Sequence, residues 1–333
     1  MPMKVTVEEI AKMAGVSKAT VSRVLNRSVK GVSDQTRQRI QKILDEVNYS
    51  HDSVGTAMRS RVVALVVPDI TNPFFADIAR SVTRRAMLDN YAVILVDTAF
   101  SAEKEQELVA NLVAKKIDGM ILVSSCTTGC KEHKMLEKYG IPLVLLDRKL
   151  EGVDFGAGIY SDNEYAAFCC CEKLIKSGAR EIAFISGPLK YSTAKERMSG
   201  YQAALKQYAI PLDPSRIKTG DYTVNSGYSA IMEMEKENIR YSAVLAANDL
   251  MALGALRALK EFSYRIPEDK QIIGFDNIDF TQYCEPSLST VQQPSIEMGK
   301  CAMEALLKLL NGEAEKTSLR LQPKLLLRQS TKP

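Results

Sequence analysis

From residue 62 onward, short apolar runs alternate with amphipathic helical stretches, and this alternation most constrains the fold. The expected strands cover 62–67, 92–96, 119–123 and 142–146, with helices near 75–89, 103–116 and 131–139. The alternation then restarts, with expected strands at 181–186, 242–247 and 271–275 and helices near 163–177, 193–208, 226–238 and 249–262. Such a pattern predicts parallel sheets with helices on both faces. Its repetition predicts two lobes, with a ligand cleft beyond the carboxyl ends of the strands.

The N-terminal residues 5–26 read VTVEEIAKMAGVSKATVSRVLN and have a different pattern. Thr6 and Glu9 are spaced as a capping box that opens one helix. Gly15 interrupts that helix, and Ser17 is placed to cap a second one. Two short helices joined by a tight turn predict a helix-turn-helix, whose second helix fits the major groove of DNA. A third helix is expected over about 34–47.

The charge is concentrated in this N-terminal part of the 333-residue chain. Residues 1–61 contain eleven Lys and Arg against six Asp and Glu, a net charge of +5, whereas the whole chain carries +4. A basic module on a nearly neutral body suits phosphate contact at one end and another task elsewhere. There is no leader-like apolar run and no apolar stretch of membrane-spanning length. We therefore expect a cytoplasmic protein that does not contact a membrane.

The seven cysteines show no spacing typical of a disulfide framework. Cys169 to Cys171 are consecutive in an expected helix and cannot share a metal. Cys126, Cys130 and His133 offer three ligands near a strand end, but structural zinc sites normally have four. Free thiols are therefore the favoured interpretation, and neither a metal nor a cofactor is expected.

The chain lacks the sequence patterns of common enzymes on doubly wound folds. It contains no G-x-G-x-x-G, no P-loop, no G-x-S-x-G and no metal triad. Its two histidines are His51, in a polar linker, and His133, in an expected Lys- and Glu-rich helix. An enzyme is therefore not expected.

The helix-turn-helix, linker and two-lobed body together resemble the lac/gal repressor family of bacterial transcription regulators over essentially the whole chain. The supporting segments in the body are PDITNPFF (68–75), LLDR (145–148), NDLMALGALRAL (248–259), IIGFDN (272–277) and STVQQP (289–294). The resemblance implies an N-terminal all-α helix-turn-helix domain, then an α/β body like that of periplasmic sugar-binding proteins, with doubly wound parallel sheets. The expected parts are a DNA-binding domain (1–50), a hinge (51–61), a first lobe (62–161 with 293–320) and a second lobe (162–292 with 321–333). The last helix, over about 297–311, and a closing strand, over about 319–328, are expected to pack back onto the first lobe. The implied partners are double-stranded operator DNA, a small sugar effector and a second copy of the chain.

Carried over by the resemblance, Lys18, Ala19 and Arg23 face base edges. The residues expected to contact phosphates or to brace the helix are Thr6, Ser17, Thr20, Ser22 and Asn26. Arg23 can pair bidentately with guanine, at about 1–3 kcal/mol of discrimination. The hinge departs from the family pattern of Pro-Asn followed by Ala-Arg-Ser-Leu, since His51-Asp52 and Gly55-Thr56-Ala57-Met58 stand there. Met58 is the apolar residue that could act as the minor-groove wedge.

Polar and aromatic residues at successive strand ends predict the effector site, at positions like those through which ribose-type binding proteins hold a pentose. These residues are Asn72, Phe74, Phe75, Asp147, Arg148, Arg197, Tyr222, Asn248, Phe275, Asp276 and Gln292. Carboxylates and guanidinium groups suit sugar hydroxyls, and phenyl rings cover the C–H faces of a sugar ring. Ser124-Ser125 stands where a further amide ligand is expected. The alternative for each residue is a structural role, such as Asn248 capping the helix that follows it.

The predicted function is that of a dimeric transcription regulator, a repressor of a palindromic operator, which senses ribose, a similar pentose or its phosphate. The alternative is a carbon-catabolite regulator whose partner is a serine-phosphorylated phosphocarrier protein. A set of sugar-binding groups in the cleft distinguishes the first from the second.

Overall fold

The computed structural model describes residues 7–25, 32–46, 60–313 and 318–333, and it divides into two compact units at Ser60/Arg61. The N-terminal unit contains α1 (Val7–Ala14), α2 (Lys18–Leu25) and α3 (Asp34–Glu46). Gly15 has φ +62°, a backbone conformation that favours glycine, and it ends α1. The hydroxyl of Ser17 accepts the backbone N–H of Thr20 at 3.2 Å, as an N-cap should. Helix, turn and helix therefore lie where the sequence predicts them.

One small core holds the three helices together. Each helix contributes apolar residues at helical spacing, and together they are Ile10, Ala11, Ala14, Val21, Val24, Ile40 and Leu44. Ser17 and Lys18 are not part of this core, and both are exposed to solvent.

The C-terminal unit is built on two six-stranded sheets. The first has the order β11-β5-β4-β3-β1-β2 and the second the order β12-β10-β9-β8-β6-β7. The strand bounds are β1 Val62–Val67, β2 Ala92–Asp97, β3 Gly119–Leu122, β4 Leu143–Leu146, β5 Ala157–Ser161, β6 Ile182–Ser186, β7 Ile217–Thr219, β8 Ala243–Ala246, β9 Gln271–Asp276, β10 Ser289–Gln292, β11 Ser318–Leu321 and β12 Lys324–Leu326. All pairings are parallel except that of β10 with β12. The predicted pair of parallel α/β lobes is confirmed.

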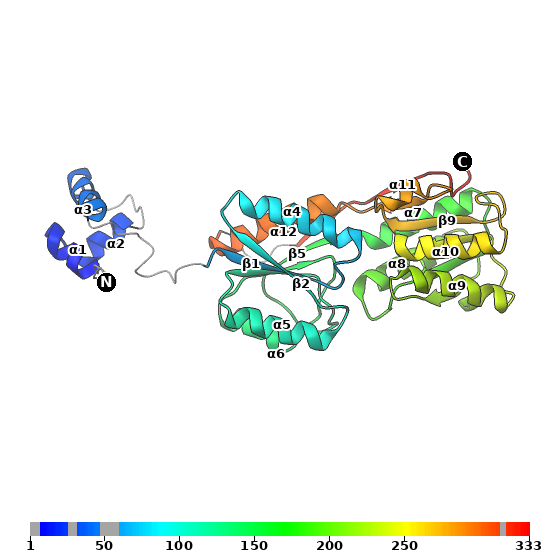
Figure 1. Ribbon diagram of the computed structural model, residues 1–333, viewed down its shortest axis with the longest axis horizontal. Helices are drawn as coiled ribbons and strands as arrows, with labels where there is room; N and C mark the ends of the chain where they lie inside the picture. The colour runs from blue at the N-terminus through cyan, green and yellow to red at the C-terminus, as the bar shows by residue number, and fades with distance from the viewer. Residues whose placement is uncertain (1–6, 26–31, 47–59, 314–317) are drawn as a thin grey trace. The chain divides into compact units, whose positions relative to one another are not determined.

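Helices cover both faces of each sheet, as Figure 1 shows most clearly for the first lobe. Their bounds are α4 Pro73–Met87, α5 Ala102–Ala114, α6 Lys131–Lys138, α7 Asn163–Lys176, α8 Ser192–Gln207, α9 Val224–Lys236, α10 Asp249–Glu261, α11 Phe280–Tyr283 and α12 Ser295–Leu310. Alternate residues of β1 enter different cores, because successive side chains of a strand point to opposite faces. Val63 and Leu65 pack with α4 and α12, whereas Ala64 and Val66 pack on the side of α5.

The closing segment differs from the expectation of one strand on the first lobe. It is divided into two short strands, with β11 paired to β5 in the first sheet and β12 paired to β10 in the second. The chain thus passes between the lobes after β5, after β10 and again after β11. Strands β5, β7 and β10 were also missed from the sequence, because AGIYS, IKT and STVQ are short and are not continuous apolar runs. Among the described helices, none is both long and apolar enough to cross a membrane.

Candidate functional site

A pocket lies at the carboxyl ends of the strands of both lobes. Its lining consists of Asn72, Phe74, Phe75, Phe100, Asp147, Arg148, Thr193, Arg197, Tyr222, Asn248 and Asp276. Nine of these eleven residues are among those predicted from the sequence. Phe100 and Thr193 were missed, although Phe100 follows β2 closely, much as Phe74 follows β1. The free volume is about 20 Å³, little more than one water molecule needs.

Several residues of this pocket have a strained backbone. Asp147, Tyr222 and Asp276 have φ values of 64°, 72° and 119°, in the region that L residues rarely adopt. Such conformations cost about 1–3 kcal/mol each and cluster at ligand-binding sites. Here they turn the side chains that follow β4 and β9 toward the pocket.

Arg197 is held rigidly by the second lobe. Its Nε donates to Oδ1 of Asn163 at 2.9 Å, and its Nη1 donates to the carbonyl oxygen of Ala247. The guanidinium carbon lies 3.8 Å from the centroid of the Phe275 ring. Phe275 is therefore buried against Arg197. The sequence predicts it as an effector-site residue, but it is not part of the pocket lining. It orients the guanidinium by a cation–π contact.

Arg148 is enclosed by aromatic rings from both lobes. Its guanidinium carbon lies 4.0 Å from the ring centroid of Tyr191, 5.3 Å from that of Phe100 and 5.9 Å from that of Tyr222. Its Nη1 donates to the carbonyl oxygen of Ser124 at 3.1 Å. The three rings and the aliphatic stem of Arg148 exclude water from its guanidinium, and cation–π contacts are stronger where water is excluded.

Four buried polar atoms at this site have no hydrogen-bond partner among the residues that the structure describes. They are Oδ1 of Asp147, Nε of Arg148, the Tyr222 hydroxyl and Oε1 of Gln293. Buried polar groups in folded proteins are nearly always satisfied, and each exception calls for an explanation. Two of these atoms accept hydrogen bonds, one donates, and the Tyr222 hydroxyl can donate or accept. Such a set matches the hydroxyl groups of a polyhydroxylated ligand, each of which can donate and accept.

The buried carboxylates of the site have raised pKa values. Burial raises the pKa of Asp147, although Arg148 and Arg197 oppose the shift. Burial also raises the pKa of Asp276 to about 7, again opposed by Arg197. Asp249, the first residue of α10, is fully buried, and burial followed by repulsion from Asp276 raises its pKa strongly. Hydrogen bonds donated by a ligand would favour the charged forms.

The prediction for Gln292 needs a correction. Gln292 is exposed, whereas Gln293 is 3% exposed and donates from Nε2 to Oδ1 of Asp276 at 3.2 Å. Gln292 is the exposed last residue of β10, whereas Gln293 lies just beyond the strand and is buried against Asp276. Two adjacent glutamines cannot be distinguished from the sequence, because the course of the chain after β10 decides the contact: the strand register pairs Gln292 with Asp276, yet Gln293 makes the hydrogen bond.

The capping alternative is correct for two residues that also line the pocket. The side chain of Asn72 accepts the N–H of Phe74 at the start of α4, and that of Asn248 accepts the N–H of Met251 at the start of α10. Nδ2 of Asn248 donates to the carbonyl oxygen of Tyr222 at 3.0 Å. Their amides are thereby fixed in place at the pocket wall.

The candidate DNA-reading residues are described in part. Ser17, Lys18 and Thr20 lie at the start of α2, and Nζ of Lys18 forms an exposed ion pair with Glu8 at 2.7 Å. Ala19, Ser22 and Arg23 belong to the same helix, but their side chains lie outside the described part of the structure. Thr6, Asn26 and Met58 lie outside the described residues altogether.

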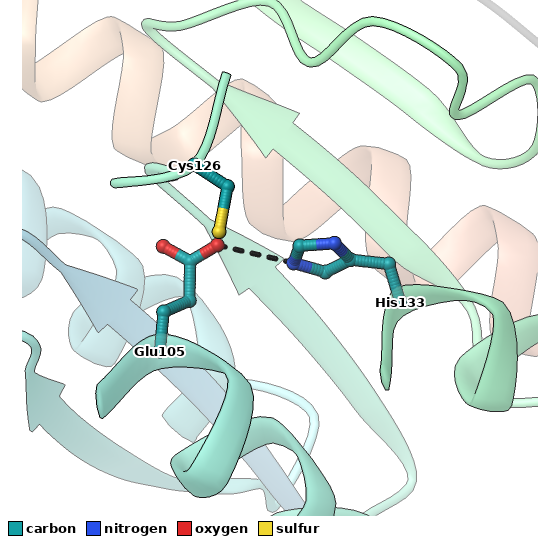
Figure 2. A group of neighbouring side chains, drawn as sticks. All are labelled: Glu105, Cys126 and His133. Atoms are coloured by element: carbon teal, nitrogen blue, oxygen red, sulfur yellow. Dashed lines mark hydrogen bonds and ion pairs between the residues drawn. The ribbon is translucent and has the colours of Figure 1, made fainter. Parts of the chain in front are cut away.

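A cluster of three buried side chains in the first lobe has the residue types of a metal site (Figure 2). Glu105, Cys126 and His133 bring potential ligand atoms within 4.8 Å of one another. Glu105 accepts from His133 Nε2 at 3.0 Å and from the Ser124 hydroxyl at 2.6 Å, while Cys130 contacts the other ring nitrogen of His133 at 3.2 Å. The three possible ligands noted in the sequence, Cys126, Cys130 and His133, are therefore not the group that the structure brings together. The carboxylate that completes the group comes from α5 and has no spacing signal in the sequence.

Comparisons with known proteins match both parts of the chain. A family model described as "Bacterial regulatory proteins, lacI family" matches residues 6–52, and one described as "Periplasmic binding protein-like domain" matches residues 171–331. Catabolite control protein A of Priestia megaterium is 34% identical over 336 residues, covering 99% of this chain and 100% of that protein. Among solved structures, a complex of the transcriptional regulator CelR with cellobiose is 32% identical, covers 98% of this chain and 99% of its own, and has a TM-score of 0.76. A lacI-family regulator from Enterococcus faecium with bound ribose is 29% identical, covers 82% and 99%, and has a TM-score of 0.74.

Proposed function

The chain belongs to the lacI family of bacterial regulatory proteins, and from that premise we propose that it is a pentose-controlled repressor that binds a palindromic operator as a dimer. Membership makes it a DNA-binding transcription regulator without enzymatic activity. The effector class, the dimer and the roles of single residues form the proposal.

The observation that carries the effector proposal is the set of four buried, unpartnered polar atoms at the inter-lobe pocket. A pentose presents several hydroxyls, each able to donate and accept. Hydrogen bonds to charged groups contribute about 1.5–3 kcal/mol each. Asp147 and Asp276 would accept from ring hydroxyls, Arg197 would donate to them, and Phe74 and Phe75 would cover the C–H face. The ribose-bound and cellobiose-bound relatives support a carbohydrate effector.

The small free volume gives the proposal a mechanism. Because the free volume of about 20 Å³ is small for a sugar, we expect the effector to enter when the lobes are further apart and then to close them around itself. A ligand shifts a conformational equilibrium only by its differential affinity for the two states. Residues from both lobes would contact the ligand, so ligand binding would stabilise the closed arrangement of the lobes over the open one. This change in lobe arrangement would in turn change operator affinity.

Exposed apolar side chains support the dimer. Met87 and Leu88, at the end of α4, are 66% and 78% exposed, and Leu95 of the edge strand β2 is 47% exposed. An uncovered apolar edge strand is a typical interface, because its unpaired backbone groups and side chains favour a partner. Leu95→Glu is expected to shift the protein toward monomer in analytical ultracentrifugation at micromolar concentration. A monomeric wild-type protein under the same conditions would contradict the dimer.

For DNA reading we propose base contacts by Lys18, Ala19 and Arg23, with a wedge role for Met58. Arg23→Ala is expected to remove sequence preference while salt-sensitive binding to unrelated DNA persists. Equal losses on operator and unrelated DNA would contradict base reading by Arg23. Lys18 must exchange its ion pair with Glu8 for a DNA contact, so Glu8→Gln should bind the operator at least as tightly as the wild type.

The deciding experiment is calorimetric titration with ribose, arabinose, xylose, glucose and galactose. Selective binding of ribose or another pentose, lost in Asp276→Ala while operator binding is retained, is the expected result. No binding of any sugar would favour the alternative, in which a serine-phosphorylated phosphocarrier protein is the co-regulator. The similarity to catabolite control protein A keeps that alternative in view.

A further inference from the structure

A second cavity adjoins the inter-lobe pocket and is strongly basic. Its volume is about 370 Å³, and its lining consists of Cys126, Thr127, Thr128, Arg148, Lys149, Glu151, Lys190, Tyr191, Ser192 and Lys195. Four of these residues are cationic and only Glu151 is anionic. Arg148 belongs to the lining of both cavities, so one molecule could contact both.

The cationic side chains come from both lobes. Arg148 and Lys149 follow β4 of the first lobe, whereas Lys190 and Lys195 lie on either side of the start of α8 in the second. Tyr191, the N-cap of this 16-residue helix, makes no side-chain capping bond. The backbone amides of the first helical turn and the helix dipole therefore add to the positive potential.

Further evidence for an anionic ligand lies in the wall between the cavities. Tyr191 is 2% exposed, and within the described part of the chain its hydroxyl has no hydrogen-bond partner; Nε of the buried Arg148, already counted at the inter-lobe pocket, has none either. The guanidinium of Arg148 and the ammonium of Lys190 lie 4.0 Å and 4.9 Å from the centroid of the same Tyr191 ring. Two cations held at one ring repel each other, and an anion bound beside them would offset that repulsion.

We propose that this cavity is an anion subsite and that the effector is a phosphorylated pentose. The sugar ring occupies the inter-lobe pocket, and the phosphate lies among Lys149, Lys190 and Lys195. Lys149 exchanges its ion pair with Glu196, now 2.6 Å long, for the phosphate. The phosphate bridges the lobes because its partners come from both. This inference rests on the proposed sugar function and specifies its ligand.

The test compares ribose, ribose 5-phosphate and inorganic phosphate by calorimetry with the full chain. The double variant Lys190→Gln/Lys195→Gln removes two exposed cations, so it should fold normally. Lys206→Gln, in the last turn of the same helix, is the matched control. In the wild type, ribose 5-phosphate should bind at least about tenfold more tightly than ribose. The double variant should lose that advantage while its affinity for ribose changes less than about twofold, and added salt should weaken only the phosphate ester strongly.

Equal affinity of the wild type for ribose and its phosphate would overturn the subsite and leave the proposed sugar function standing. An equal loss in Lys206→Gln would also overturn it, since a general charge effect would then explain the result. Lysine-dependent binding of inorganic phosphate without binding of either sugar would support an anion site and contradict the pentose proposal. Lysine-dependent binding of a phosphoserine peptide, with no response to ribose 5-phosphate, would overturn the assignment of a small-molecule ligand.

Discussion

Under the proposed function, the raised pKa of Asp276 should make effector affinity depend on pH. Burial raises this pKa to about 7 in the free protein, with Arg197 and Gln293 opposing the shift and Asp147 adding to it. Sugar hydroxyls that donate to the carboxylate favour its charged form, so binding must release the proton. If the pKa in the complex falls below 5, one proton is released, and affinity should drop about 25-fold, or about 1.9 kcal/mol, from pH 7.5 to pH 5.5.

Stability should respond with the opposite sign. An unfolded Asp has a pKa of about 3.9, so between about pH 4 and pH 7 the folded protein holds a proton that the unfolded chain has released. The contribution of Asp276 to the free energy of unfolding therefore falls as pH rises through that window. Weaker sugar binding at low pH thus cannot be attributed to unfolding caused by this group.

Calorimetry in buffers of different ionisation enthalpy measures both the affinity and the protons released. Asp276→Asn is the control, because its amide does not titrate and any remaining slope reports other groups such as Asp147. The variant should bind at least about tenfold more weakly at pH 7.5, having lost a charge-assisted hydrogen bond. A wild-type affinity that is flat, or that rises toward pH 5.5, would refute the argument that Asp276 binds the sugar as a carboxylate.

Three further changes test the packing around the site. Glu105→Gln removes a fully buried charge with several hydrogen bonds and should lower the free energy of unfolding by about 3–5 kcal/mol in urea titrations. The control Glu107→Gln changes an exposed side chain of the same helix and should alter the free energy of unfolding by less than about 0.5 kcal/mol. Similar values for the two variants would contradict a structural role of the buried group. Gly254→Ala would place a Cβ 1.9 Å from a backbone oxygen of α9 and should cost at least about 1–3 kcal/mol in the same assay, so an unchanged midpoint would show that the two helices can separate freely. Gly187→Ala would place a Cβ 2.1 Å from the Tyr222 ring, and it should weaken sugar binding in calorimetry; unaltered affinity would argue against a role for Tyr222 in the pocket.

Much of the fold is encoded locally and could be read from the sequence. The N-cap at Ser17, the positive φ of Gly15 and the apolar spacing of the three helices are local properties. The long strands such as β1 and β9 are continuous apolar runs, because both faces of a parallel sheet are covered by helices. Local signals of this kind also place most pocket residues, since polar side chains at strand ends must meet at one edge of a sheet.

Short strands and the closing segment could not be read in this way. β7 and β12 have three residues each, too few to show a period. The closing segment is divided into β11 and β12 because each pairs with an edge strand of a different sheet, β5 and β10. Both partners are distant in sequence, so the residues of the segment itself do not indicate the division.

Local sequence features specify the DNA-reading module, the two α/β lobes and the chemistry available at their facing ends, because propensity, capping and side-chain period act over a few residues. Long-range packing establishes which of two adjacent glutamines contacts Asp276, that Phe275 supports Arg197, and that Glu105 completes a buried group with His133 and Cys126. The same packing brings lysines from both lobes to the lining of one cavity beside the inter-lobe pocket. These relations join residues far apart in the chain, and they exist only once sheet register and lobe packing have brought those residues together.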